Sequence, residues 1–264
     1  MELPLFPLNS VLCPGIALPL HIFEDRYRAM VRHCLETTSP FGVVLIRDGR
    51  EVGAGSISFT GVGTIAEIRD AGTYDDGRYD LLVVGTRRFE IRRVLTGRRP
   101  YLVAEVDILD EAVGDDDTAH RLAMRATRRF VSYLELLRPR VGETADEIDV
   151  RVEVEAADDG KEPADRGSDD PPADEIGGAE PPDDPAGTPR RRRVTIPDDP
   201  TVLSFLLAGI LQVESPRRQA LLEAATTEDR LRDLLGLIDR EVFLLDQRLR
   251  IYRPEPRMVG AHRS

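Results

Sequence analysis

The chain has 264 residues, of which 41% are hydrophobic and 32% charged, and its formal net charge is −12. This length suffices for one large domain or two small ones with a real hydrophobic core. The two cysteines, Cys13 and Cys34, exclude a disulfide-rich scaffold and favour a reducing compartment. The start of the chain lacks the basic segment of a secretory signal, and its longest helix-like apolar run, Val202–Val213, is too short to cross a bilayer. We therefore expect a cytoplasmic protein that does not span a membrane.

The negative charge is concentrated in one block of the chain. Residues 142–189 contain 17 Asp and Glu against 3 Lys and Arg, a net charge of −14. The rest of the chain is therefore nearly neutral, which argues against a strongly basic nucleic-acid groove. The basic run Arg190–Arg193 is interpreted as a solvated segment attracted to the acidic residues before it, rather than as a nucleic-acid or localisation patch.

Residues 1–115 carry the pattern of short strands separated by turns. Pro7 and Pro14 are predicted to bracket the first strand and its turn, where Gly15 supplies a permissive backbone. Four further strands are predicted from β-branched runs and apolar alternation: Phe41–Asp48, Thr60–Gly72, Tyr79–Val84 and Tyr101–Leu109. Asp76-Gly77 is a hairpin-turn signal just before the third of them. This pattern favours a closed or nearly closed antiparallel β-barrel.

A helix is predicted at Phe23–Glu36, where apolar residues recur at helical spacing. At its start, the segment His21–Arg28 mixes apolar and charged side chains and admits two interpretations. In the first, it is a ligand-facing surface with arginines as hydrogen-bond donors. In the second, which we favour, it is a strand-to-helix junction: Phe23 and Tyr27 enter the core, and Glu24 pairs with an arginine or caps the helix.

Helical periodicity replaces the strand pattern after Thr118. The helix Thr118–Arg138 has one apolar face and ends before a proline. A second helix is predicted from Pro200 behind an acidic N-terminus, a short third one begins at Ser215, and Thr226 caps the last. The last helix carries a packing seam at alternating four- and three-residue spacing: Leu231, Leu235, Ile238, Val242, Leu245 and Leu249. These helices need apolar partners, so we expect them to form one bundle.

The predicted fold class is α+β, with a β-barrel followed by an α-helical bundle. Residues 1–115 form the barrel subdomain, 116–140 the first helix, 196–253 the rest of the bundle and 254–264 a flexible tail. The segment 141–195 is rich in Asp, Glu, Pro, Gly and Ala, and it cannot bury enough apolar surface to offset its ordering entropy. We therefore predict that it is a disordered acidic insertion inside the helical subdomain.

No catalytic, cofactor or metal motif is present in the sequence. Lys161 is the only lysine, and it is followed by Glu162 in the acidic block, which excludes both a P-loop and a Ser–Lys dyad. Cys13, His21, His33 and Cys34 are not spaced as zinc ligands. We expect no enzymatic activity, no cofactor and no metal site.

Three short motifs near the N-terminus carry a family resemblance: PLFPL at Pro4–Leu8, VLCPG at Val11–Gly15 and LPLHIFEDRYR at Leu18–Arg28. Together they resemble the opening of the Lon substrate-binding domain, the N-terminal domain of ATP-dependent Lon proteases. The resemblance continues through Phe41–Ile46, Gly61–Ile68, Gly85–Ile91, Tyr101–Val106, Asp199–Ser204, Arg218–Glu223 and the final helix. It covers nearly all of the chain except about residues 142–195.

The resemblance implies a PUA-like β-barrel subdomain followed by a helical bundle. It also implies a non-catalytic protein- or peptide-binding module, because this domain of full-length Lon helps to capture unfolded or tagged proteins. The sequence contains neither the AAA+ module nor the Ser–Lys peptidase domain, so it resembles the stand-alone bacterial members. We expect an adaptor or holdase in protein quality control, with exposed hydrophobic protein segments and a protease or chaperone as partners. Phe23, Arg26 and Tyr27 are the candidate peptide-binding residues.

Two alternatives stay open. PUA-like barrels in other families bind RNA, so the second hypothesis is a nucleic-acid-binding protein that its own acidic segment inhibits. The nearly neutral folded part argues against it, whereas one surface that gathers six arginines would support it: Arg87, Arg88, Arg92, Arg93, Arg98 and Arg99. The third hypothesis is a small-molecule-binding barrel or a hydrolase, which requires a deep polar pocket.

Overall fold

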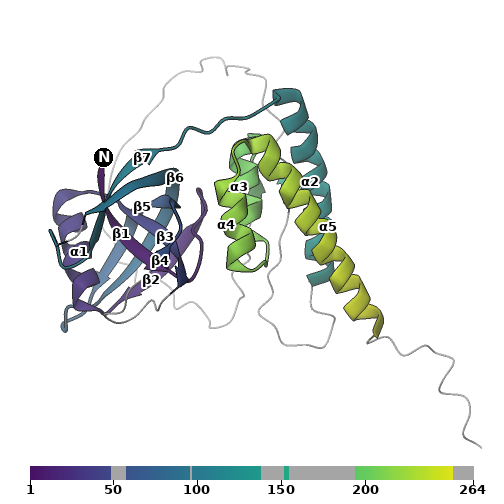
Figure 1. The fold of residues 1–264 in the computed structure, drawn as a ribbon. Coiled ribbons are helices and arrows are strands. Elements are labelled where there is room, and N and C mark those ends of the chain that lie inside the picture. Colours follow the sequence, from purple (N-terminus) through teal and green to yellow (C-terminus); the bar gives the residue numbers. More distant parts are fainter. Residues whose placement is uncertain (49–57, 96, 138–151, 155–193, 252–264) are drawn as a thin grey trace, which may run out of the picture. The chain divides into compact units, whose positions relative to one another are not determined.

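The computed structural model describes residues 1–48, 58–95, 97–137, 152–154 and 194–251 (Figure 1). The chain divides into two compact units, one made of Met1–Leu137 and Pro197–Ser264 and the other of Arg138–Ile196. The first unit contains the large sheet and the helices.

Within the described residues of the first unit, seven strands form one mixed sheet. In chain order they are β1 (Glu2–Leu8), β2 (Ala17–Ile22), β3 (Phe41–Asp48), β4 (Ser58–Phe59), β5 (Val62–Thr73), β6 (Tyr79–Leu95) and β7 (Leu102–Ile108). Their hydrogen-bonded order is β1-β7-β6-β5-β3-β4, and β2 pairs with β6. A further pairing of β1 with β3 is parallel and joins the two ends of the path β1-β7-β6-β5-β3. The α+β class is confirmed, but the purely antiparallel barrel was wrong, because β1 and β3 are joined through a crossover that contains a helix.

Of the two prolines predicted to bracket the first strand and its turn, Pro14 lies in the turn but Pro7 does not bound the strand. Pro7 is inside β1, opposite Val44. A proline can occupy a strand because its fixed φ falls in the extended region. The predicted turn is present after Leu12: the Ile16 N–H donates to the Cys13 carbonyl at 3.2 Å, and Gly15 has a φ of +78°.

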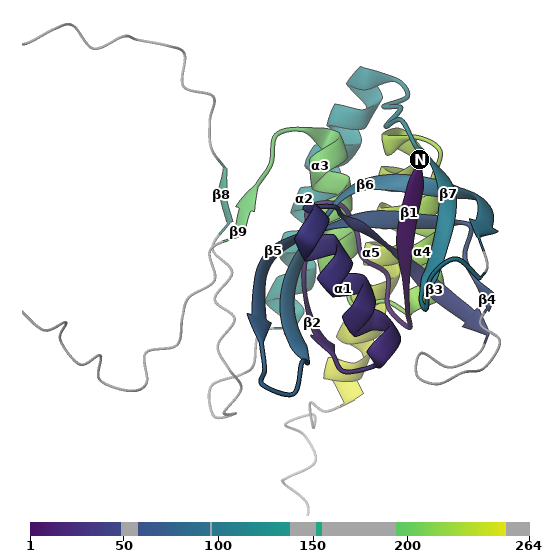
Figure 2. The same ribbon diagram turned by 90° about the vertical axis from the view of Figure 1, so that its left-hand side faces the viewer.

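An apolar cluster lies on the inner face of the sheet and is closed by the helix α1 (Asp25–Thr37). Figure 2 shows α1 lying across the strands. The helix buries four side chains: Tyr27, Met30, Val31 and Cys34. They join one cluster with strand residues such as Phe6, Phe41 and Val83, all at most 6% exposed. Apolar periodicity at helical spacing thus predicted the right helix, although it begins two residues later than expected.

The helices after the sheet are α2 (Asp116–Leu137), α3 (Pro200–Ile210), α4 (Ser215–Glu223) and α5 (Thr227–Ile251). The two predicted starts are confirmed: the Asp199 side chain accepts hydrogen bonds from the backbone of Thr201 and Val202, and the Thr226 hydroxyl accepts from the Asp229 N–H. α5 packs against α2 and α3, and α3 also packs against α2 and α4. Of the predicted seam residues, Leu231, Leu235 and Ile238 are buried, and Val242 and Leu245 are partly exposed.

The second unit contains two described strands, β8 (Val152–Val154) and β9 (Val194–Ile196), which pair in parallel. The other residues of the predicted disordered insertion, and those of the predicted tail after Ile251, lie outside the described residues. No helix in the described ranges combines the length and apolar character that crossing a bilayer requires.

Candidate functional site

The three residues predicted to bind peptide do not share one surface. Tyr27 is only 4% exposed, and its ring packs edge-on against Phe6 at 4.5 Å between centroids. The Arg26 guanidinium lies over the Tyr27 ring at 4.4 Å and donates to Glu24 at 3.0 Å. Phe23, in contrast, is 49% exposed. The core interpretation is therefore confirmed for Tyr27 and wrong for Phe23, and Glu24 pairs with an arginine as predicted.

Phe23 belongs to an exposed group of rings and charges at the end of β2 and the tip of the β5–β6 hairpin. We call it the Phe23 cluster and define it as His21, Phe23, Tyr74, Arg78 and Asp80. The His21 ring stacks on Phe23 at 6.2 Å and meets Tyr74 edge-on at 6.1 Å. At the other end of this row, the Arg78 guanidinium lies over the Tyr74 ring, 5.1 Å from its centre. Three rings from two segments, the end of β2 and the β5–β6 hairpin, therefore form one aromatic row at the surface.

Asp80 fixes the geometry of this row. One carboxylate oxygen lies 2.6 Å from His21 Nδ1, and the other accepts from the Tyr74 hydroxyl at 2.5 Å. The hydrogen bonds from Tyr74 and then from His21 lower the pKa of Asp80, and the bond to Asp80 raises the pKa of Tyr74. Since a ring that is already oriented loses little conformational freedom on binding, this carboxylate preorganises the cluster for contact with an apolar partner.

The hairpin that carries Tyr74 and Asp80 is attached to α1 by one arginine. Arg28 donates to the backbone carbonyls of Gly77 and Asp76, each at 2.8 Å, and to the Asp25 carboxylate at 2.9 Å. The favoured structural interpretation of the His21–Arg28 segment therefore holds for Arg28. The sequence missed Tyr74 and Asp80 as site residues, although the Asp76-Gly77 turn signal implied that the two lie close together.

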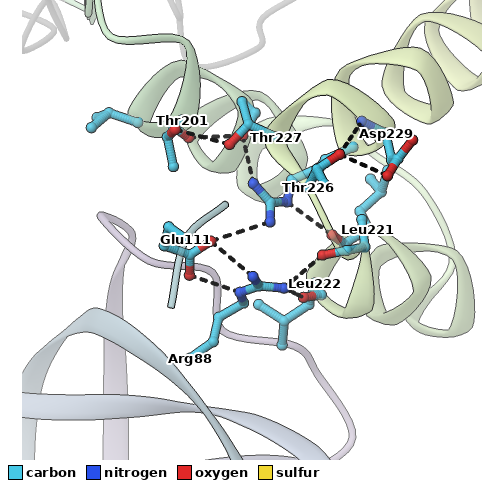
Figure 3. A network of polar contacts seen from close by, with 12 residues as sticks. Arg88, Glu111, Thr201, Leu221, Leu222, Thr226, Thr227 and Asp229 are labelled. Atoms are coloured by element: carbon cyan, nitrogen blue, oxygen red, sulfur yellow. Dashed lines mark hydrogen bonds and ion pairs between the residues drawn. The ribbon is translucent and has the colours of Figure 1, made fainter. Parts of the chain in front are cut away.

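A second group of charged residues is buried where the strands meet the helices (Figure 3). Arg88, on β6, is 3% exposed and holds Glu111 with two parallel hydrogen bonds of 2.8 Å. Its third guanidinium nitrogen, Nη1, donates to the carbonyls of Leu222 at 2.7 Å and Ala224 at 2.8 Å, at the end of α4. A bidentate arginine thus joins a strand to a helix that lies 134 residues further along the chain.

Arg230, on α5, completes this buried network. It is fully buried, donates to the Leu221 carbonyl and the Ser204 hydroxyl, and lies 3.4 Å from Glu111. Its guanidinium is 3.7 Å from the centre of the Phe205 ring. Burial, and then the nearby Arg88 charge, lower the pKa of Arg230 to about 10. The two arginines, from β6 and α5, together bond groups of α3 and α4 and share Glu111, so the network joins the strands to the helices.

The geometry gives little support to a reactive thiol, a metal site or a catalytic pocket. Cys13 and Cys34 are both buried, and desolvation raises the pKa of each thiol, that of Cys13 to about 11. No three His, Cys, Asp or Glu side chains converge as metal ligands within the described ranges. A cavity of about 630 Å³ lies between the start of β1 and the end of α1. There the Thr37 hydroxyl donates to the His33 carbonyl and lies 2.7 Å from the Ser39 hydroxyl.

The six arginines that would mark a nucleic-acid surface are largely engaged in other contacts. Arg88 is buried. Three others are paired with carboxylates on neighbouring strands: Arg92 with Asp107 at 2.6 Å, Arg93 with Glu105 at 2.7 Å and Arg98 with Glu2 at 2.7 Å. These pairs reduce the positive potential of the β6–β7 surface, on which phosphate binding depends.

Known proteins resemble this chain both in sequence and in fold. The Lon protease of Anaeromyxobacter dehalogenans is 30% identical over 148 residues, and Lon protease 2 of Myxococcus xanthus is 31% identical over 116 residues. These alignments cover 55% and 44% of this chain but only 17% and 14% of the relatives. The chain thus matches less than a fifth of the length of these Lon proteases.

Two solved structures cover most of the chain. The Lon N-terminal domain protein from Xanthomonas campestris is 25% identical, with a TM-score of 0.53, and the match covers 89% of this chain and 98% of that one. The N-terminal domain of a Mycobacterium avium complex Lon protease has a TM-score of 0.56 at 17% identity, over 90% and 98% of the two chains. The model of the ATP-dependent protease La (LON) substrate-binding domain matches residues 2–240. The chain therefore belongs to the LON substrate-binding domain family.

Proposed function

We propose that this chain is a non-catalytic module that binds exposed apolar segments of unfolded proteins. The observation that carries the proposal is the Phe23 cluster, whose rings are exposed to solvent while Asp80 bonds His21 and Tyr74 and the His21 ring stacks on Phe23. Exposed aromatic residues of this kind dominate the energetics of protein interfaces, because each contributes a large contact area at little entropic cost. Membership of a substrate-binding family supports a polypeptide as the ligand.

The test is a binding titration of the purified full-length chain by fluorescence anisotropy. The probe is fluorescein-labelled α-lactalbumin, reduced and carboxymethylated so that it stays unfolded. We expect saturable binding that persists at 0.5 M NaCl, because apolar contacts are not screened by salt. Phe23→Ala should weaken it by roughly 5- to 30-fold, which corresponds to a loss of about 1–2 kcal/mol of binding free energy.

A matched control separates the Phe23 cluster from general surface hydrophobicity. Phe243, on α5, is 61% exposed and therefore more accessible than Phe23. Phe243→Ala should leave the affinity for the unfolded probe unchanged. Equal losses for the two variants, with both proteins folded by circular dichroism, would contradict the assignment of the site.

The proposed module can act as an adaptor or as a holdase, and the two roles differ in what happens to the client after binding. A holdase alone suppresses the aggregation of an unfolding client, which light scattering measures. An adaptor accelerates degradation of the client by an ATP-dependent protease, and this effect should also depend on Phe23. We infer a cytoplasmic site of action for either role from the reduced state that two buried free cysteines favour.

The nucleic-acid alternative is less well supported, because carboxylates pair with Arg92 and Arg93 on β6 and with Arg98 before β7. The same titration with a labelled single-stranded RNA tests it. RNA binding that falls steeply with salt, without binding of the unfolded protein, would replace the polypeptide proposal.

A further inference from the structure

The edge of β2 is the feature from which we infer how a client is held. β2 pairs with β6 in antiparallel register from Ala17 opposite Val84 to Ile22 opposite Tyr79. No other described strand pairs with β2. Its second edge therefore carries backbone groups that no described strand satisfies.

The alternation of the strand shows which backbone groups these are. The Gly85 N–H donates to the Ile16 carbonyl at 3.0 Å, so Ile16 faces β6. In an antiparallel pair, every second residue bonds the same neighbour, so Leu18 and Leu20 face β6 as well. The alternate residues Ala17, Pro19 and His21 turn their backbone groups away from β6. Pro19 has no N–H, and in this position the missing donor breaks no bond to β6. The outer edge thus presents the N–H and C=O of Ala17 and His21 and the C=O of Pro19.

The side chains beside this edge are apolar and accessible. Leu18 and Leu20 turn inward and pack against the same cluster as Tyr27 and Met30, which places α1 on the inner face. The outer face carries the exposed residues Ala17, Pro19 and His21. Leu82, opposite Pro19 on β6, is 42% exposed on that face. The outer row ends at the rings of the Phe23 cluster.

We propose that the outer edge of β2 receives an extended segment of a client polypeptide as an additional strand. The client's backbone bonds Ala17, Pro19 and His21, and its alternate apolar side chains lie over Pro19, Leu82 and the Phe23 cluster. This mode of recognition reads backbone groups, which every unfolded chain offers, and adds selectivity through the side chains of one face. It deepens the proposed function and rests on it.

Pro19 decides between a client and a second copy of this chain as the occupant. Two β2 edges paired about Pro19 would lose two hydrogen bonds, because neither proline can donate to the other strand. A client strand without proline loses only one, because its own N–H still reaches the Pro19 carbonyl. A proline on an exposed edge is also a known protection against self-association. The edge is therefore suited to foreign chains and not to its own.

The first test uses backbone methylation of a model client and leaves the protein unchanged. The parent probe is a labelled octapeptide of alternating valine and threonine with lysine at each end. Methylating only the threonine nitrogens leaves the valine edge able to pair while the valine side chains lie over Pro19 and Leu82, so this peptide should bind within about threefold of the parent. Methylating nitrogens on both edges blocks strand pairing from either side, and we expect at least a tenfold loss of affinity.

The second test removes one donor from the protein. Ala17→Pro deletes an outward N–H at the first position of the strand, where proline is tolerated. It should weaken binding of the octapeptide by roughly 3- to 10-fold, the equivalent of one hydrogen bond. Ala17→Ser keeps the N–H and is the matched control, expected to bind as the unaltered chain does. Amide exchange by NMR should show that the Ala17 and His21 amides gain protection when the peptide binds.

The outcomes separate this inference from the proposed function. Binding of the unfolded protein with equal affinity for doubly methylated and parent peptides would overturn strand addition while leaving the binding module intact. No binding of any polypeptide would overturn both. If sedimentation shows a dimer that the octapeptide competes away, the edge belongs to a second copy of the chain and the client proposal is wrong. The methylated peptides decide the matter even if Ala17→Pro fails to fold.

Discussion

Replacing Arg88 by methionine should cost the protein a large part of its stability. The substitution removes four hydrogen bonds, two to Glu111 and two to the carbonyls of Leu222 and Ala224. Removing one partner of a buried ion pair costs about 3–5 kcal/mol. Glu111 is 27% exposed and keeps Arg230 at 3.4 Å, so water and the second arginine soften the loss. We therefore expect a decrease of about 3 kcal/mol in the free energy of unfolding.

Urea denaturation followed by circular dichroism measures this change. Tyrosine fluorescence is a second probe that needs no correction for tryptophan, because the chain has none. Arg92→Met is the control: its guanidinium also pairs with a carboxylate, Asp107, but at the surface, and the urea midpoint should hardly move. A loss below about 1 kcal/mol for Arg88→Met, or equal shifts for both variants, would refute the view that this network joins strands to helices.

Three further results are expected. Because burial raises the pKa of Cys13 to about 11, the stability that the protonated thiol confers is fully present below pH 9 and is lost as the pH rises to 11. Cys13→Ala should therefore remove roughly 3 kcal/mol from the decrease in the free energy of unfolding between pH 9 and pH 11, measured by urea titration. Gly77 and Gly15 both have φ near +80°, but only a Cβ at Gly77 would clash with Arg28, so Gly77→Ala should lower the melting temperature more than Gly15→Ala, and equal shifts would contradict this contact. Asp199→Ala removes the cap of α3 and should cost about 1 kcal/mol in the same urea assay, while no change would show that the cap is redundant.

Local chemistry explains which parts of the fold were predictable. The strand at Phe41–Asp48 has the predicted bounds, because alternation and a turn signal are properties of neighbouring residues. The caps at Asp199 and Thr226 were predictable for the same reason. The parallel pairing of β1 with β3 was not, because no nearby residue records which distant strand completes a sheet.

The site was predicted less well, again for physical reasons. Helical spacing assigned Phe23 to the buried face of a helix. Because α1 begins at Asp25, Phe23 lies before the helix, and its side chain is exposed. Arg88, Glu111 and Arg230 resemble solvated surface charges in the sequence. Only the packing of strands against helices removes them from water, and no periodicity indicates that.

The order in which the chain is made has a consequence for Arg88. Its acceptor on α4, the Leu222 carbonyl, is 134 residues away, and ribosomes add about 5–20 residues per second. Roughly 7 to 27 s therefore separate the synthesis of this arginine from that of its final partner. Strands β1 to β7 are all made once Ile108 has been added, but α4, which contains the Leu222 carbonyl, has still to be synthesised. Until α4 has been made, Arg88 lacks the two carbonyl acceptors that it has in the folded chain.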